Sequence, residues 1–174
     1  MSFRTMLAGL NAEEVEYVVI GGLAGTIHGA ERVTNDLDIC YARTPENLAR
    51  LGRVLEAWHA YPREIPPGLP FSPDARTLAN TQLLTLTTDE GDMDVLAEVA
   101  GLGDYSALAS HTEYVTAFGL TIPILSLPAL IRAKRAAASM RPRYREHIAE
   151  LEALLEARMA PDAGIRDTRE GESA

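Results

Sequence analysis

Three aspartates in strand-like segments are the residues of this sequence most suited to chemistry. Asp36 and Asp38 lie two residues apart in the segment DLDICY, and Asp94 lies in the apolar segment MDVL. Because successive side chains of a strand point to opposite faces, the first two carboxylates share one face while Leu37 and Ile39 face the core. Like charges this close repel each other, and divalent cations such as Mg²⁺ offset that repulsion by binding carboxylate oxygens. Asp94 would be costly to bury without a partner, which indicates a cleft or a counter-charge.

Each of these signals also has a simpler explanation. Asp36 and Asp38 could be exposed acids at a strand end that only increase solubility. Asp94 could form a salt bridge with one of the arginines. Asp92 and Glu98 share the face of Asp94 in a regular strand, but Asp92 lies at the preceding turn and Glu98 lies further along, so Asp94 is the preferred candidate.

A pair of glycines between a strand-like segment and a helix is the second chemical signal. Gly21 and Gly22 allow a sharp turn and let a phosphate approach bare backbone amides. The helix that follows favours anions at its N-terminus. Most strand–Gly–Gly–helix junctions are only tight turns, so the pair carries weight only together with the aspartates.

Taken together, these residues predict a site for phosphoryl-type transfer in which two metal ions hold the attacking and leaving oxygens. We predict that Asp36 and Asp38 bind both ions. We predict that Asp94 binds one ion and lies near the acceptor hydroxyl, where it could help to remove the proton.

The pattern around these residues predicts an α/β or α+β domain, with a mixed sheet, helices packed on it and further helices at the C-terminal end. A segment with five prolines, residues 62–73, predicts a long ordered loop or lid. The predicted strands are residues 16–20, 36–41, 83–87, 93–99, 114–118 and 120–125. The predicted helices are residues 3–13, 23–28, 45–58, 105–110 and 126–140, and a last helix with Tyr144, Ile148, Leu151, Leu154 and Leu155 on its core-facing side.

Length and composition set the limits of these predictions. The 174 residues predict one domain over residues 1–160 and a flexible tail over residues 161–174. With no apolar run long enough to span a membrane, no signal-peptide pattern and a single cysteine, we expect a cytoplasmic protein without a membrane partner.

The net charge of the chain and its distribution limit which partners it could bind. The net charge of −9 argues against a general attraction to nucleic acid. Residues 132–145, however, contain six basic residues and no acidic one, and they could contact phosphates or form a solvated helix face. Lys134 is the one lysine among the 16 basic residues, and an ammonium is a more compact point charge than a guanidinium.

These residues resemble the nucleotidyltransferase superfamily that includes the polymerase-beta-like enzymes. Within it, they look most like the small bacterial branch around AbiEii-type toxins and MNT antitoxins. The resemblance covers roughly residues 15–155, and its R-x-T-x-D-x-D part, Arg32 to Asp38, is fairly specific. It is carried by VIGGLA at 19–24, GAERVTNDLD at 29–38, MDVL at 93–96 and the helix 127–141.

The resemblance implies transfer of a nucleoside monophosphate from a nucleoside triphosphate to a hydroxyl, with release of pyrophosphate. It implies two Mg²⁺ ions, or Mn²⁺ in their place, on Asp36, Asp38 and Asp94. The residues implied to bind the nucleotide are Gly21, Gly22, Arg32, Thr34 and Lys134. The acceptor stays open between RNA or tRNA, a hydroxyl of a partner toxin or antitoxin protein, and a small molecule such as an aminoglycoside or lincosamide.

The chain departs from the pattern of this branch at two positions. Many relatives carry serine where Gly22 stands, and relatives often carry an acid where Tyr144 stands. Tyr144 also fits the core stripe of the last helix. The two departures favour the alternative of a catalytically weak module that binds nucleotide or a partner protein. A purely structural domain is the third alternative.

Overall fold

The computed structural model describes residues 2–138 and 144–160. The predicted tail over residues 161–174 and the predicted end of the helix at residue 140 lie outside the described residues. No helix in the described part of the chain is long and apolar enough to cross a membrane.

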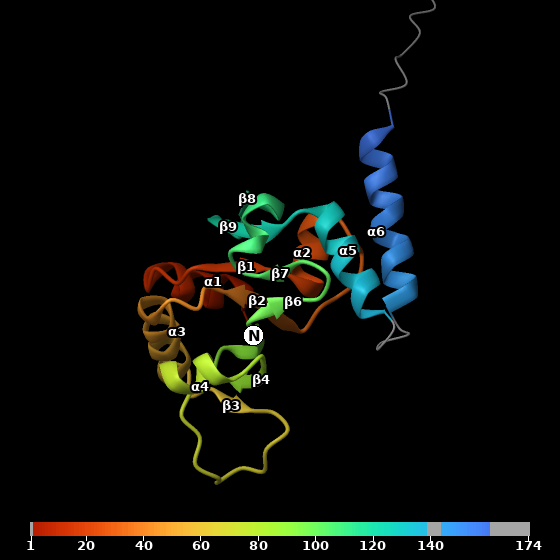
Figure 1. Cartoon of the computed structure of the whole chain (residues 1–174). Helices are drawn as coiled ribbons and strands as arrows, with labels where there is room; N and C mark the ends of the chain where they lie inside the picture. The colour runs from red at the N-terminus through yellow and green to blue at the C-terminus, as the bar shows by residue number, and fades with distance from the viewer. Residues whose placement is uncertain (1, 139–143, 161–174) are drawn as a thin grey trace, which may run out of the picture.

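A seven-stranded mixed sheet forms the centre of the molecule (Figure 1). Its order is β3-β4-β5-β2-β1-β9-β8, and a separate two-stranded sheet joins β6 and β7. The strands are β1 (Tyr17–Val19), β2 (Asp36–Tyr41), β3 (Tyr61–Pro62), β4 (Leu83–Thr88), β5 (Gly91–Leu96), β6 (Glu98–Val99), β7 (Gly103–Asp104), β8 (Thr112–Ala117) and β9 (Leu120–Leu125). The central strands β2 and β5 are parallel, whereas β4 and β1 flank them antiparallel. This mixed α/β architecture confirms the predicted fold class.

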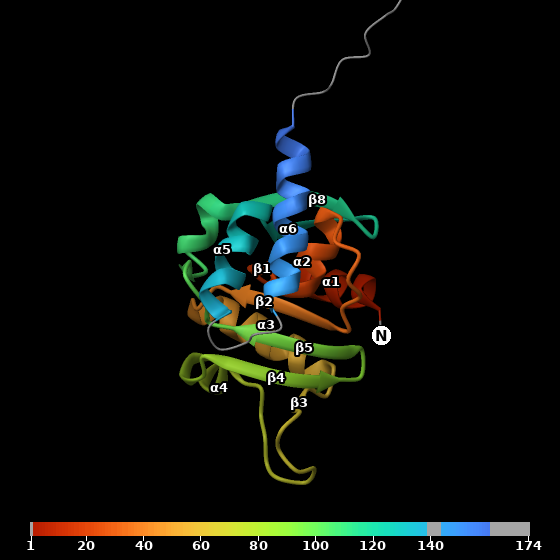
Figure 2. The ribbon, with the colours of Figure 1, turned by 90° about the vertical axis from the view of Figure 1, so that its right-hand side faces the viewer.

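Helices cover both faces of the sheet. Figures 1 and 2 show α1, α3 and α4 on one face and α2, α5 and α6 on the other. Their bounds are α1 (Phe3–Ala12), α2 (Gly21–His28), α3 (Pro45–Ala57), α4 (Ala75–Asn80), α5 (Leu127–Ala137) and α6 (Tyr144–Met159), with a 3-10 helix over Ala107–His111.

Local signals in the sequence explain where several of these helices begin and end. The side chain of Thr44 accepts a hydrogen bond from the Asn47 amide at 3.3 Å, and Pro45 occupies the first helical position of α3. Helix α2 ends at Gly29, whose φ of 109° is a left-handed conformation that glycine adopts easily. These two boundaries match the prediction.

The structure differs from the prediction in several places, and the strand predicted over residues 93–99 is divided into β5 and β6. Helix α2 begins at Gly21 rather than at Leu23. Helix α4 was not predicted, because its six residues are too short for an apolar period to show; Asp74 caps it by accepting from the Thr77 amide at 2.8 Å. In α6 the buried residues are His147 and Leu151, and Ile148, Leu154 and Leu155 pack against the core. Tyr144 is partly buried and is not among the residues that pack there, so the prediction of Tyr144 as a core residue of the last helix is wrong.

A buried asparagine fixes the strands β1 and β2 to helix α3. Asn47 is fully buried, and its Oδ1 accepts from the Glu16 amide at 2.7 Å. Its Nδ2 donates to the carbonyls of Ala42 at 2.8 Å and of Glu16 at 3.0 Å. The asparagine therefore joins the start of β1 to the end of β2, the strand that carries Asp36 and Asp38.

We expect Asn47→Ala to lower the free energy of unfolding by about 3 kcal/mol, because buried backbone groups lose their partners. Urea denaturation measures the change. The matched control is Asn80→Ala, since Asn80 is exposed and donates only to the carbonyl of Arg76. Its expected cost is below about 0.5 kcal/mol. Equal losses in the two variants would contradict this role for Asn47.

Candidate active site

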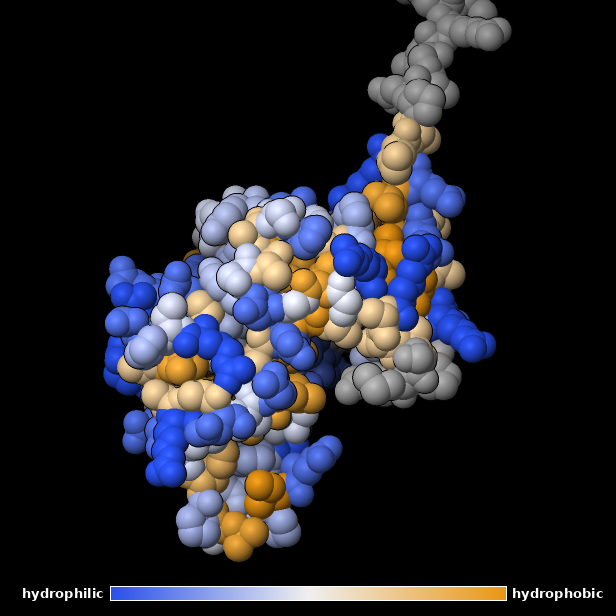
Figure 3. Space-filling view, in the orientation of Figure 1, coloured by the Kyte–Doolittle hydropathy of each residue, from blue (hydrophilic) through white to orange (hydrophobic). Residues whose placement is uncertain are grey.

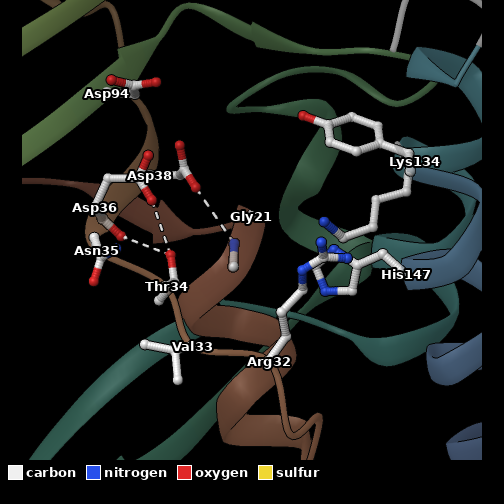
Figure 4. Close-up of a pocket in the computed structure, with 12 residues that line it drawn as sticks. Gly21, Arg32, Val33, Thr34, Asn35, Asp36, Asp38, Asp94, Lys134 and His147 are labelled. Carbon is white, nitrogen blue, oxygen red and sulfur yellow. Dashed lines mark hydrogen bonds between the residues drawn. The ribbon is translucent and has the colours of Figure 1, made fainter. Parts of the chain in front are cut away.

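The sheet brings the three predicted aspartates together. Strands β2 and β5 pair in parallel, and their register places Asp38 beside Asp94 and Asp36 beside Asp92. One carboxylate oxygen from each of Asp36, Asp38 and Asp94 lies within 4.8 Å of the others (Figure 4). All three side chains are partly buried. Such a set of hard oxygen ligands fits a divalent cation like Mg²⁺ or Mn²⁺.

Asp38 lies at the centre of the cluster and bears most of the electrostatic cost. Burial, and then the neighbouring charges of Asp36 and Asp94, raise the pKa of Asp38 to about 7. The Gly22 amide, 3.4 Å from Oδ2, and the Lys134 ammonium oppose this rise in pKa. The cluster therefore favours a bound cation or a proton on Asp38 at neutral pH.

The two glycines pack directly against the acidic residues. Gly21 has a φ of 64°, and a Cβ there would lie 1.9 Å from Oδ2 of Asp38. A Cβ on Gly22 would lie 2.4 Å from Oγ1 of Thr34, which in turn donates to Oδ1 of Asp36 at 2.8 Å. Thr34 thus fills the space that a side chain on Gly22 would need. This gives a steric reason for glycine at a position where many proteins of the resembled branch carry serine.

The first turn of helix α2 faces the same site. No side chain caps this helix, since its N-cap residue Ile20 makes no side-chain hydrogen bond. The amides of the first turn of a helix attract anions. The Gly–Gly junction therefore places the start of a helix beside the aspartates, and phosphate binding there stays a prediction.

The aspartates and the two glycines line a cavity of about 320 Å³, which is called the first cavity below. Basic side chains form the wall opposite the aspartates. Figure 4 shows Arg32, Lys134 and His147 grouped together, across the cavity from the aspartates. Lys134 is only 7% exposed, and burial lowers its pKa while Asp38 opposes the change. The remaining lining includes Gly21, Gly22 and Thr34, so every residue predicted to bind nucleotide lies at this cavity.

Sequence reasoning missed His147 in this wall and did not place Tyr144 there. The Tyr144 ring lies 5.0 Å from the Lys134 Nζ, within the range of a cation–π contact. Burial, Lys134 and Arg32 lower the pKa of His147 to about 4, so its imidazole is neutral at pH 7. Within the described chain, Nε2 of His147 is a buried atom with no hydrogen-bond partner. The helical spacing of the sequence indicates that His147 and Leu151 lie on one face of the last helix. It does not indicate that this face borders a cavity, so His147 could not be predicted as a site residue.

Arg63 was also missed, because it lies in the proline-rich segment and no pattern distinguishes it there. Its guanidinium forms ion pairs with Asp94 and, at 3.4 Å, with Asp92. Asp94 therefore has an arginine partner, as the simpler explanation predicted, and it also belongs to the three-carboxylate cluster. Arg63 also accounts for Asp92, which belongs to the same sheet face but not to the three-carboxylate group. Glu98 is exposed in β6.

Solved structures of several proteins share this arrangement of strands and helices. A Thermotoga maritima protein described as a nucleotidyltransferase is 20% identical, with 88% of this chain and 90% of that chain covered and a TM-score of 0.51. The antibiotic-resistance factor ANT(2'')-Ia, in complex with adenylyl-2''-tobramycin, is 13% identical over 87% of this chain and 84% of that chain, with a TM-score of 0.56. An antigenic nucleotidyltransferase-like protein from Paracoccidioides brasiliensis is 13% identical over 88% of this chain and 73% of that chain, with a TM-score of 0.54.

The chain therefore has the nucleotidyltransferase fold, as predicted. No protein-family model and no curated protein sequence matches it. The narrower AbiEii and MNT branch stays a prediction.

The raised pKa of Asp38 predicts a specific pH dependence of stability. In the metal-free protein, the free energy of unfolding should fall as pH rises from 3.8 to about 7, because the folded state binds the Asp38 proton more tightly than the unfolded state. Above pH 7, Mn²⁺ or Mg²⁺ should recover the loss. Thermal melting against pH measures both effects. Asp38→Asn should flatten the pH curve and abolish the recovery; an unchanged curve in this variant would contradict the assignment.

Steric coupling between Gly22 and Thr34 gives a second prediction. Gly22→Ala should lower the free energy of unfolding by about 1–3 kcal/mol, because the new Cβ overlaps both Oγ1 and Cβ of Thr34. In the double variant Gly22→Ala/Thr34→Gly the overlap is absent, so the two effects should be clearly non-additive. Urea denaturation of the four proteins of this cycle measures the coupling. Simple additivity would show that Thr34 does not restrict position 22.

Proposed function

We propose that the protein is a metal-dependent nucleotidyltransferase that moves a nucleoside monophosphate from a nucleoside triphosphate to a hydroxyl. The observation that carries this proposal is the division of the first cavity into two walls of opposite charge. Three carboxylates on one wall suit divalent cations, and basic side chains on the other suit a polyphosphate. A magnesium triphosphate carries both kinds of charge. The nucleotidyltransferase fold supports the same reaction class.

Each residue has a part in this proposal. Asp36, Asp38 and Asp94 would hold the cations. Bound there, Mg²⁺ or Mn²⁺ supplies neutralisation of phosphate charge and activation of the hydroxyl. Lys134 and Arg32 neutralise the triphosphate from the opposite wall.

The remaining contacts prepare the site before the substrate arrives. The amides at the start of α2 orient the phosphates, and Thr34 holds Asp36 through its hydroxyl. Asp94 pairs with Arg63, and it would take the proton from the acceptor hydroxyl. The protein thus acts mainly by positioning groups and balancing charge, which suits phosphoryl transfer.

Finer parts of the function stay predictions. These are the use of two ions, the acceptor class, the cytoplasmic location, the single domain and a toxin or antitoxin partner. ANT(2'')-Ia was solved with an adenylylated tobramycin, which gives a small molecule as one precedent for the acceptor. RNA, tRNA and protein hydroxyls are the other predicted classes.

A catalytically weak nucleotide-binding module is the second candidate. Two contacts favour it: the Tyr144 ring covers the Lys134 ammonium, and Arg63 already pairs with Asp94. Both would have to adjust if metal and triphosphate bind. The intact carboxylate cluster favours the active enzyme. In an inactive site, three carboxylates that repel each other would lower stability without serving a function.

Metal-linked nucleotide binding and transfer separate these candidates. Mg²⁺ with a nucleoside triphosphate should raise the melting temperature of the native protein as ligand concentration rises. Incubation with each α-labelled triphosphate, Mg²⁺ and a cell extract should then transfer label to an acceptor and release pyrophosphate. The weak-module candidate predicts the melting shift without transfer.

The control for this experiment is a pair of conservative variants. Asp36→Asn/Asp38→Asn should lose both the melting shift and the transfer. Asp89→Asn changes an exposed aspartate that pairs with His59, away from the cavity, and should keep both. The proposal fails if the first variant binds or transfers as well as the native protein.

A further inference from the structure

A second cavity of about 360 Å³ adjoins the first one at the carboxylate cluster. The two cavities share the lining residues Gly21, Asp38, Asp94, Lys134 and Tyr144. Arg32, Thr34 and His147 line the first cavity but not the second. Asp38 and Asp94 therefore lie where the two cavities meet, and the other lining residues of the two cavities differ.

The walls of the second cavity are mainly apolar. They come from the ends of β4, β5 and β9, from β6 and from helix α5, with Leu83, Leu96, Val99, Leu125, Leu130 and Ala133 among them. Figure 3 shows a recess between α5 and the strand β4, with hydrophobic residues beside it. Glu98 and Gln82 are its further polar side chains, and Lys134 is its one basic residue within the described ranges 2–138 and 144–160.

The direction of the transfer reaction assigns a role to each cavity. In an in-line displacement, the attacking oxygen and the leaving pyrophosphate stand on opposite sides of the α-phosphorus. Arg32 lines only the first cavity, which places the leaving phosphates there. The attacking hydroxyl must then approach across Asp38 and Asp94, from the side of the second cavity.

We propose that the second cavity binds the acceptor, and that the acceptor is a phosphate-free compound that carries its hydroxyl on an apolar frame. The proposal rests on the proposed function and narrows its acceptor class. A phosphodiester of RNA would lie close to the Glu98 carboxylate, which is outside the group that would hold the cations, and like charges repel. The apolar walls would also take its charged groups from water without offering hydrogen bonds in return. An uncharged ring or side chain with one hydroxyl is not repelled by the carboxylates and leaves no charged group buried against the apolar walls.

The transfer step balances without a further reactant. The hydroxyl oxygen forms a bond to the α-phosphorus, and the bond from that phosphorus to the bridging oxygen breaks. The electron pair of the broken bond leaves with pyrophosphate. The hydroxyl proton passes to the Asp94 carboxylate and then to solvent.

Acceptor probes test the assignment directly. The protein is incubated with Mg²⁺, all four nucleoside triphosphates and three classes of probe: uncharged cyclic alcohols and phenols, a peptide with a central tyrosine, and an RNA oligonucleotide with a free 3′-hydroxyl. Mass spectrometry then detects the added nucleoside monophosphate. The first two classes distinguish a free compound from a protein side chain as the source of the apolar hydroxyl.

A variant that fills the second cavity tests whether the acceptor binds there. Ala137 lines the cavity on α5 and is partly exposed, so Ala137→Trp adds bulk there without disturbing the core. Ala137→Leu is a smaller change of the same kind. Ala153→Trp is the matched control, because Ala153 is exposed on α6 and lines neither cavity.

We expect adducts on the alcohols, phenols or tyrosine peptide and none on RNA. Ala137→Trp should lose at least tenfold in transfer and Ala137→Leu less, whereas Ala153→Trp should match the native protein. All three should keep the melting shift with Mg²⁺ and nucleotide. An RNA adduct, an absence of adducts on every apolar probe, or loss of the melting shift in Ala137→Trp would each overturn the acceptor assignment. Absence of any melting shift in the native protein would instead overturn the proposed function itself.

Discussion

Repulsion among carboxylates on two neighbouring strands is the constraint on which the rest of the site depends. The parallel register of β2 and β5 forces Asp38 to lie beside Asp94, and the alternation of β2 adds Asp36 on the same face. A sheet would be more stable without this arrangement. The surrounding contacts reduce its cost: Arg63 forms an ion pair with Asp94, the Lys134 ammonium attracts Asp38, and the Gly22 amide in the first turn of α2 donates to Asp38.

These compensating groups are arranged unevenly, and that asymmetry gives the site its direction. Arg32 and His147 lie on the side of α2 and α6, whereas the apolar residues lie on the side of β4, β5 and α5. A charged triphosphate and an uncharged acceptor would therefore meet at the aspartates from different directions. Tyr144 and Lys134 border both spaces, so the start of α6 and the end of α5 couple them.

Much of this could be predicted from local patterns. Alternation in DLDICY predicted that Leu37 and Ile39 are buried, although Cys40 and Tyr41 are both buried and end the alternation. Gly29, Thr44 and Pro45 predicted helix ends, because these signals act within a few residues. The grouping of Asp94 with the DxD pair followed from residue type and from the resemblance to a known family. Arg63 could not be found, because its role arises only from the pairing of β3, β4 and β5. The apolar second cavity was likewise invisible, since its walls come from segments far apart in the sequence.

The most direct measurement of the central claim is a crystal structure grown with Mn²⁺ and a non-hydrolysable nucleoside triphosphate, with the manganese located by anomalous scattering. We expect manganese between Asp36, Asp38 and Asp94, with the phosphates between these ions and the wall formed by Arg32 and Lys134. Manganese elsewhere, or a triphosphate bound away from this wall, would contradict the proposed site.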